Sequence, residues 1–466
     1  MLRMVSQTDA AAAPKSLPKQ MLIFALPIMA MNILQLLFNA ADMVVVGRFS
    51  GSEALAAVGA TGALINLIVN LFMGLSVGTT VVLANDYGAQ RYDDIKLTVH
   101  TSMAVSMISG LIVMGIGLAF CVPLLRMMGT PEDIITGSAL YMRIFFLGLP
   151  GSMVYNFGAA VMRAVGDSRR PTYFLTIAGV ANVILNLFFV AGLRMGVAGV
   201  AWATVISQYA AMGLTLLSLI RRDGPIRFIP RLMTIDRRKL LGIVRIGLPA
   251  GLQGVLFSIS NVLIQSAVNS FGSVVVAASA AAGNVEGFVA TTSNAFYNAA
   301  LTFTGQRMGA EDYDGIDTIA KVCTAYVFLN WLVVGGATIY FGPTLLGFYT
   351  TNPEVIAVGM ERMRVLMAVY FTCGTMNVFP GITRAMGYSV LPMLCTLVGA
   401  CLMRIVWLVT FFAWMPTITM LFLCYPVTWT LAGLGQVAVF FYARKQVRKR
   451  AAAVSGITPA APAAVR

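Results

Sequence analysis

The chain carries the same sequence pattern twice, about half its length apart. The segment that begins at Gly88 (Gly-Ala-Gln-Arg-Tyr-Asp) returns at Gly309 as Gly-Ala-Glu-Asp-Tyr-Asp, at an offset of 221 residues. The segment that begins at Arg163 (Arg-Ala-Val-Gly-Asp-Ser) returns at Arg384 as Arg-Ala-Met-Gly-Tyr-Ser, at the same offset. A period of this length is too long for a solenoid repeat, so it indicates a duplicated domain. In hydrophobic chains such duplications are typical of secondary transporters, in which the substrate path runs between the two copies.

The composition of the chain is that of a membrane protein. Hydrophobic residues make up 58% of the sequence and charged residues 11%, whereas a soluble domain carries about 25% charged residues. A helix needs about 20 apolar residues to cross a bilayer, and each half of the chain has six such stretches. They lie at 19–46, 53–84, 95–120, 134–161, 171–191, 196–220, 242–270, 275–305, 317–341, 355–382, 391–412 and 417–443.

Six stretches per half give both copies the same orientation in the membrane, so the copies are related by an axis along the membrane normal. We therefore expect an all-α polytopic membrane protein with twelve transmembrane helices in two six-helix lobes. The expected division is a cytoplasmic N-terminal segment 1–18, a first lobe 19–220, a basic cytoplasmic connector 221–241, a second lobe 242–445 and a basic, then Ala/Pro-rich, cytoplasmic tail 446–466.

The net charge of +14 is distributed as a membrane topology signal. If the N-terminus is cytoplasmic, 25 of the 32 Lys and Arg residues fall on the cytoplasmic side, and only Arg48, Arg126 and Arg194 fall in outside loops. This asymmetry is the positive-inside pattern. It predicts a plasma (inner) membrane protein with both termini in the cytoplasm. It argues against nucleic acid as a partner, and the basic run Arg444–Arg450 is expected to contact anionic membrane lipid.

Enzyme and metal chemistry have no support in the sequence. The six cysteines lack a CxxC motif and His100 is the single histidine, so neither a disulfide framework nor a metal site is expected. The sequence has no Walker motif that would bind ATP. We therefore expect no enzymatic activity and no cofactor, and a membrane-embedded enzyme or structural protein is the weakest of the functional readings.

The first apolar stretch carries a polar stripe that predicts an ion or substrate path. Asp42 lies late in this stretch, with Gln35 and Asn39 on the same helical face. A charge inside a membrane costs ~2.5–3.5 kcal/mol on insertion scales, so it usually serves transport. The alternative is that Asp42 caps the outer end of the helix near Arg48.

The fifth and sixth stretches add carboxamide and hydroxyl groups to the first half. Asn182 and Asn186 are four residues apart and share a helical face, and the sixth stretch carries Thr204 among small residues that allow close helix packing. These three residues either bind a coupling cation together with Asp42 or form structural hydrogen bonds between helices.

The second half has its own polar faces. The seventh stretch carries Asn261 and Gln265, and the eighth carries Asn294 and Glu286. We expect the polar faces that carry these four residues to look at each other or to line a shared substrate cavity. Arg404, in the eleventh stretch, is a candidate counter-charge either for Glu286 or for an anionic substrate.

Several short motifs occur in a fixed order along the stretches. They are Leu26-Pro27, Asp42 with Gly47, Gly88-Ala89-Gln90, Arg163-x-x-Gly166-Asp167 with Pro171, and the run from Gly196 to Gln208. This set resembles the multidrug and toxic compound extrusion (MATE) family over roughly residues 17–445. The resemblance implies a cation-coupled exporter with two six-helix bundles in a V shape that opens alternately to either side of the membrane.

The resemblance also implies roles for individual residues. In the family an acid on the first helix binds the coupling ion in the first-lobe cavity, and Asp42 falls at that place. Gln35, Asn182 and Thr204 match first-lobe cavity positions at the family's spacing. Many members carry a second acid on helix 5, where this chain has Asn186.

The coupling ion is H⁺ or Na⁺. Members that couple Na⁺ through the second lobe carry an acid on helix 7, where this chain has Phe257. A lone buried carboxylate, Asp42, favours H⁺, because burial disfavours the charged form of a carboxyl group. Na⁺ held at Asp42 by amide and hydroxyl oxygens is the alternative.

The sequence therefore predicts a secondary antiporter, working as a monomer, that exports small amphipathic and often cationic organic compounds. The alternative is a lipid or lipid-linked saccharide flippase of the related superfamily. Such a protein has to bind phosphate, and among the intramembrane residues only Arg404 and Arg143 offer a suitable positive charge.

Overall fold

The protein is an all-helical membrane protein in the part of the chain that the computed structural model describes, residues 16–128, 130 and 132–455. Eleven helices are long and apolar enough to cross a membrane, and a pair of helices that meet at a bend of 53° supplies a twelfth span. The expectation of an all-α chain with twelve membrane spans is confirmed.

The spans fall into two sets of six, which we call the first and second lobe. The first lobe contains Leu17–Gly51 and Ala56–Gly88 (the two halves of α1, Leu17–Gly88), α2 (Tyr92–Met127), α3 (Glu132–Ala164), α4 with the π-helix η2 (Arg169–Gly192) and α5 (Gly196–Arg221). The second lobe contains α6 (Arg237–Asn269), α7 (Ser273–Gly309), α8 to α9 (Tyr313–Tyr340), the bent pair α11 (Pro353–Met367) and α12 (Tyr370–Ala385), α13 to η6 (Val390–Phe412) and α15 (Ile418–Ser455).

The internal repeat extends to the backbone. Gly51 joins the first two spans with φ 87°, and its counterpart Gly272, 221 residues later, precedes α7 with φ 88°. Gly166 and Gly387, also 221 residues apart, have φ 91° and 89°. Because residues with a side chain rarely adopt this left-handed region, these glycines fix the same turns in both lobes.

Several helix boundaries differ from those expected from the sequence, and α6, for example, starts at Arg237, inside the expected connector 221–241. The first helix starts at Leu17, and the last helix continues through the basic run as far as Ser455. The rest of the expected terminal segments, 1–15 and 456–466, lies outside the described residues. Arg444 and Arg448 pair with Asp317 of α8, at 2.5 and 2.9 Å, so part of the run expected to contact lipid packs against the second lobe.

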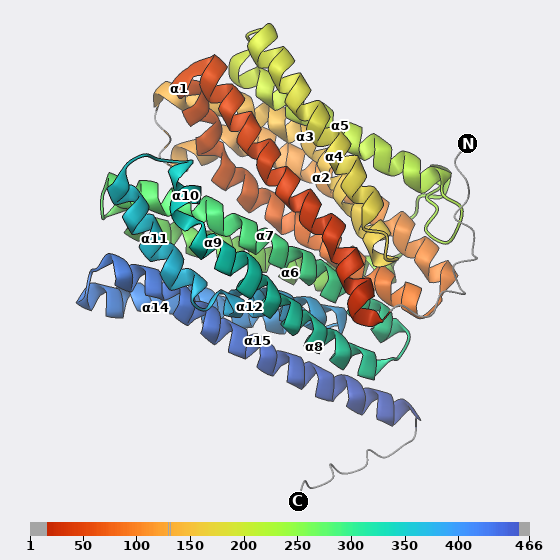
Figure 1. Cartoon of the computed structure of the whole chain (residues 1–466). Helices are drawn as coiled ribbons and strands as arrows, with labels where there is room; N and C mark the ends of the chain where they lie inside the picture. The colour runs from red at the N-terminus through yellow and green to blue at the C-terminus, as the bar shows by residue number, and fades with distance from the viewer. Residues whose placement is uncertain (1–15, 129, 131, 456–466) are drawn as a thin grey trace, which may run out of the picture.

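The first helix crosses from one lobe to the other. Figure 1 shows the red start of α1 beside α8, while the rest of α1 lies with the orange and yellow helices. Met21 and Phe24 are buried in a core that α7, α8, α12 and α15 supply, and the hydroxyl of Tyr326 donates a hydrogen bond of 2.9 Å to the carbonyl oxygen of Pro18. The start of the first helix is thus part of the core of the second lobe.

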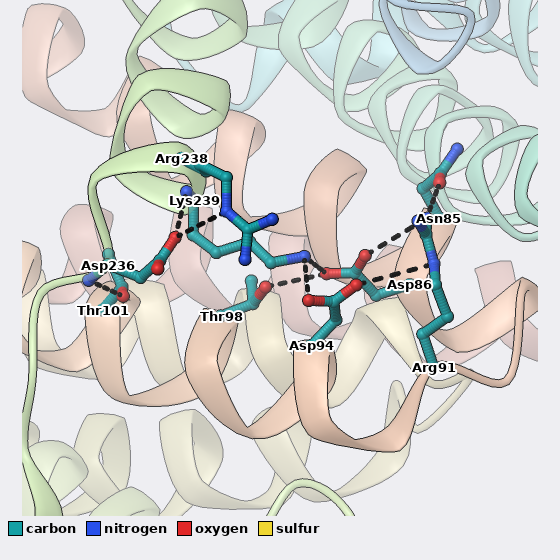
Figure 2. A network of polar contacts seen from close by, with 9 residues as sticks. All are labelled: Asn85, Asp86, Arg91, Asp94, Thr98, Thr101, Asp236, Arg238 and Lys239. Atoms are coloured by element: carbon teal, nitrogen blue, oxygen red, sulfur yellow. Dashed lines mark hydrogen bonds and ion pairs between the residues drawn. The ribbon is translucent and has the colours of Figure 1, made fainter.

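The start of α6, in turn, packs against the first lobe. Figure 2 shows Lys239, near the start of α6, between two acids of the first lobe. Its ammonium group lies 2.7 Å from the carboxylate of Asp86 and 3.4 Å from that of Asp94. Thr98 also donates to Asp86, at 2.8 Å, and Asp86 is 3% exposed. This buried ion pair holds the beginning of the second lobe's first helix on the first lobe.

Glycines bring the two lobes into backbone contact at one end of the molecule. A Cβ atom at Gly78 would lie 2.2 Å from the carbonyl oxygen of Ile243, and one at Gly88 would lie 1.9 Å from that of Gln306. Only a residue without a side chain permits so close an approach. We call this the Gly88 end of the molecule.

The opposite end, which carries Gly51, has no such contact at its glycines. A Cβ atom built at Gly62, or at its repeat counterpart Gly283, would meet nothing within 4 Å. The lobes therefore meet at the Gly88 end and leave space between them toward the Gly51 end.

Candidate functional site

A cavity of about 710 Å³ lies between the lobes. The first lobe lines it from α1, α3, α4 and α5, and the second lobe lines it from α6, α7 and α12. Its wall combines aromatic rings with carboxamides and hydroxyl groups. The polar lining residues are Asn32, Gln35, Asn39, Asp42, Asn66, Asn70, Ser76, Thr80, Ser152, Tyr155, Asn156, Arg163, Asn182, Thr204, Ser207, Gln208, Asn294, Tyr297, Asn298 and Arg384.

The first-lobe residues singled out in the sequence form one connected cluster. Asn186 donates hydrogen bonds to Asp42 and, at 3.3 Å, to the side-chain oxygen of Asn182. Asn182 in turn lies 3.5 Å from the hydroxyl of Thr204, which donates to the carbonyl oxygen of Val200 at 3.0 Å. Side chains of α1, α4 and α5 therefore form one series of hydrogen bonds that ends at the carboxylate of Asp42.

The cluster has the oxygen atoms that a cation requires. Asn186 is fully buried and its side-chain oxygen has no hydrogen-bond partner among the described residues. Asp42 lies nine residues before Gly51 within a continuous helix, so it faces the cavity instead of capping a helix end. A π-helix, η2, begins directly after Asn186, and such segments are frequent at functional sites.

Three further predicted residues also line the cavity. Gln35 and Asn39 are exposed on the same stripe of α1 as Asp42, and Asn294 faces the cavity from α7 in the second lobe. Asn294 accepts a hydrogen bond of 3.0 Å from Asn298, which lines the same wall. The polar face predicted for the first helix is therefore directed toward the cavity.

Glu286 has a different environment from the one expected. Its carboxylate forms a bidentate ion pair with Arg362 of α11, at 2.9 and 3.0 Å, inside the second lobe. Glu286 is 8% exposed and is not among the residues that line the central cavity. The physical reason is that a buried carboxylate needs a charged partner, and Arg362, 76 residues away, provides it.

Arg404, the counter-charge that the sequence proposed for Glu286, is fully buried near the same Tyr425 ring as Arg362. It donates hydrogen bonds of 3.2 Å to Ser260 and 2.7 Å to Asn261, and its guanidinium lies 5.0 Å from the ring centres of Phe257 and Tyr425. Asn261 is therefore a partner of Arg404 and does not line the central cavity.

Gln265 also lies outside the cavity lining, one helical turn further along α6. It is exposed and donates a hydrogen bond of 3.0 Å to Asn269 on the same helix. Both α6 residues expected in a shared cavity thus face other surroundings, because the part of α6 that lines the cavity is its middle, at Ala250 and Gly254.

The cavity wall also contains two arginines that the sequence did not place there. Arg163 and Arg384 line the cavity at the ends of α3 and α12, just beyond the expected apolar stretches 134–161 and 355–382. Their common place in the internal repeat was the available signal. Asp42 is the one acidic side chain among the lining residues.

Within the described residues the side chains give no basis for metal or thiol chemistry. They contain no group of three or more His, Cys, Asp and Glu side chains that could hold a metal ion. All six cysteines are free, and five of them are buried.

Comparisons with known proteins agree with this architecture. The MatE family model matches the chain twice, over residues 27–188 and 249–410, which are corresponding parts of the two lobes. The chain is 30% identical to the probable multidrug resistance protein YpnP of Bacillus subtilis, over 85% of this chain and 89% of the relative. It is 29% identical to the probable multidrug resistance protein YoeA of the same organism, over 83% and 86%.

A solved structure has the same fold. It is the outward-facing conformation of a multidrug resistance MATE family transporter of the MOP superfamily, with a TM-score of 0.86 and 21% sequence identity. The match covers 93% of this chain and 97% of that one. The two-lobe arrangement seen here is therefore shared over almost the whole chain.

Proposed function

Because the chain belongs to the MatE family of membrane transporters, we propose that it is a cation-coupled antiporter that exports amphipathic, often cationic, organic compounds. The observation that carries the proposal is the lone carboxylate of Asp42 in the wall of a cavity between two repeat-related lobes. The wall adds aromatic surface from Phe38, Phe145 and Tyr297 to its carboxamides, a combination that suits compounds with apolar and polar parts.

Exchange requires that cation and substrate favour different arrangements of the lobes. A ligand shifts such an equilibrium only by the difference between its affinities for the two arrangements. A cation bound at Asp42 neutralises the carboxylate and competes for the hydrogen bond that Asn186 donates to it. We infer that this change favours release of the substrate toward the Gly51 end, and that loss of the cation favours the opposite arrangement.

We favour H⁺ as the coupling ion. The first-lobe cluster offers one carboxylate, Asp42, and a proton needs a single titratable group. Na⁺ is the alternative, because the unpartnered oxygen of Asn186 and the hydroxyl of Thr204 lie in the same cluster and hard cations prefer oxygen ligands.

We place the protein in the plasma membrane as a monomer surrounded by lipid, with both termini in the cytoplasm. The excess of basic residues on the side of the connector supports this orientation. The Gly88 end is then cytoplasmic, and the described arrangement opens to the outside. A lipid or lipid-linked saccharide flippase is the less favoured alternative, since the relatives YpnP and YoeA are named as probable multidrug resistance proteins.

The decisive experiment measures transport by purified protein in liposomes. We expect Asp42→Asn to abolish substrate movement driven by a pH gradient, because the amide keeps the size of the side chain but cannot change its charge. Glu53→Gln is the matched control, since Glu53 is an exposed acid near the Gly51 end that does not line the central cavity. Full transport by Asp42→Asn would exclude the proposed role.

The same liposomes identify the coupling ion. With H⁺ coupling, a pH gradient drives transport in the absence of Na⁺. If transport follows a Na⁺ gradient and ignores pH, H⁺ coupling is wrong, and Asn186→Asp should then increase the dependence on Na⁺ by supplying a second carboxylate.

A further inference from the structure

The closed end of the central cavity carries two arginines that the repeat relates. Arg163 lies in the last turn of α3 and Arg384 in the last turn of α12, and both line the cavity. Each is followed three residues later by a glycine with a left-handed backbone, Gly166 or Gly387. The two side chains therefore start from equivalent positions on opposite lobes. The lobes also meet at this level, where Gln306 donates a hydrogen bond of 2.7 Å to the carbonyl oxygen of Ala164.

Neither arginine is neutralised by an acid within the described residues. Arg384 is 5% exposed and donates to two uncharged groups, the hydroxyl of Tyr297 at 2.9 Å and the side-chain oxygen of Gln253 at 2.5 Å. The side chain of Arg163 forms no hydrogen bond or ion pair with any residue that the structure describes. The Nε atoms of both arginines are buried without a hydrogen-bond partner.

Two acids at this end of the molecule are already engaged by other cations. Asp167, four residues after Arg163, pairs with Arg170 at 3.5 Å and with Arg222 at 3.0 Å. Asp86, near the same end of the molecule, is held by Lys239 at 2.7 Å. The closed end of the cavity therefore keeps two positive charges that no acid among the described residues neutralises.

Charge is also separated along the cavity. Asp42 lies nine residues before Gly51, toward the open end, whereas Arg163 and Arg384 lie in final helical turns at the Gly88 end. Burying a charge without a partner is costly, and intramembrane charges usually mark a substrate path. An arginine pair maintained at this cost is suited to oxyanions, because guanidinium groups match carboxylate and phosphate geometry.

We propose that Arg163 and Arg384 bind an anionic group, a carboxylate or a phosphate, of the transported compound at the closed end of the cavity. The inference rests on the proposed export function and narrows its substrate class. A preferred substrate is a zwitterion or anion whose acidic group reaches the two arginines, while a cationic part, where present, faces Asp42.

Equilibrium binding tests this assignment without requiring transport. The probes are rhodamine B, a zwitterion with a free carboxylate, and its ethyl ester, a cation with the same aromatic framework. Each is titrated against purified full-length protein in phosphatidylcholine nanodiscs by fluorescence anisotropy. We expect the acid to bind at least about tenfold more tightly than the ester, since a charge-assisted hydrogen bond contributes about 1.5–3 kcal/mol and 1.4 kcal/mol is tenfold.

The variant Arg163→Gln/Arg384→Gln should remove this preference and leave binding of the ester intact. The double variant with lysine at both positions should retain part of it, because the charges remain. The matched control is Arg143→Gln/Arg364→Gln, a second pair of repeat-related arginines, both exposed and outside the cavity lining. This control should leave the preference unchanged.

The possible failures are distinguishable. Equal binding of the two probes, or an unchanged preference in Arg163→Gln/Arg384→Gln, overturns the anion site but leaves the export function in place. If neither probe binds, the proposal that the cavity binds amphipathic compounds is wrong, and the anion site that depends on it is wrong as well. If phosphatidylglycerol in the nanodiscs displaces rhodamine B from the wild-type protein alone, the arginines hold a lipid headgroup and the assignment to a transported compound is wrong.

Discussion

A single methyl group at Gly78 should weaken the arrangement in which the lobes meet at the Gly88 end. Gly78 of α1 faces the backbone of α6, and a Cβ atom there would lie 2.2 Å from the carbonyl oxygen of Ile243. Carbon and oxygen atoms in contact between helices are normally about 3.3–3.6 Å apart. Gly78→Ala therefore requires the two helices to separate by about 1 Å, and backbone atoms cannot rotate away as a side chain can.

The size of the effect follows from this clash. Overpacking of a well-packed interface costs about 1–3 kcal/mol, which corresponds to a shift of about 5- to 150-fold against the described arrangement at 1.4 kcal/mol per tenfold. Alanine also favours the helix by about 1 kcal/mol relative to glycine. That gain is the same in every arrangement of the lobes, so it cancels from the shift.

Distance measurement between spin labels reports the shift directly. Asp93 and Asp314 are repeat counterparts on opposite lobes at the Gly88 end, and their side chains are 98% and 93% exposed. With labels at these positions, Gly78→Ala should move the distance distribution toward longer separations. The matched control is Gly62→Ala on the same helix, where a Cβ atom meets nothing within 4 Å.

Two results would refute the reasoning. An unchanged distribution in Gly78→Ala would show that the glycine contact does not limit how closely the lobes approach. An equal change in Gly62→Ala would show that helix propensity, and not interlobe contact, controls the equilibrium.

Glu286→Gln should destabilise the protein by about 3–5 kcal/mol, because it leaves the buried guanidinium of Arg362 unpaired. The thermal denaturation midpoint in detergent should fall accordingly. Adding Arg362→Gln should restore part of the lost stability. Lys239→Met should lower the midpoint by breaking the buried contact between the lobes, whereas Arg238→Met, at a side chain that is 81% exposed, should not change it. In a variant without the native cysteines, Ala453→Cys should react with an impermeant maleimide only after cell lysis, and reaction in intact cells would refute the proposed cytoplasmic C-terminus.

Membrane spans were predictable from the sequence because their signal is local. A run of apolar residues long enough to cross the bilayer predicts a transmembrane helix by itself, without knowledge of the residues that pack against it. The cluster around Asp42 was predictable for a related reason. Helical spacing places Asn182 and Asn186 on one face, and the family resemblance pairs that face with Thr204 and the first helix.

The partner of Glu286 was not predictable in the same way. The tenth stretch contains Arg362 and Arg364, which point in different directions from one helix: Arg362 is buried against Glu286 and Arg364 is exposed. The choice between them depends on how α11 is rotated relative to α7, and that rotation is set by packing between helices far apart in the chain. Arg163 and Arg384 fell outside the expected stretches 134–161 and 355–382 because the ends of helices are the least certain part of a sequence-based assignment.

During synthesis, the start of the first helix is made long before the helices that it packs against. Met21 and Phe24 are covered by α7, α8, α12 and α15, all of which leave the ribosome after the whole first lobe has been made. The first lobe, in turn, lacks the start of α6 until Lys239 can reach Asp86. Each half produced alone would therefore expose a surface that its own helices cannot cover, so the two copies should assemble in the membrane only as an interlocked pair.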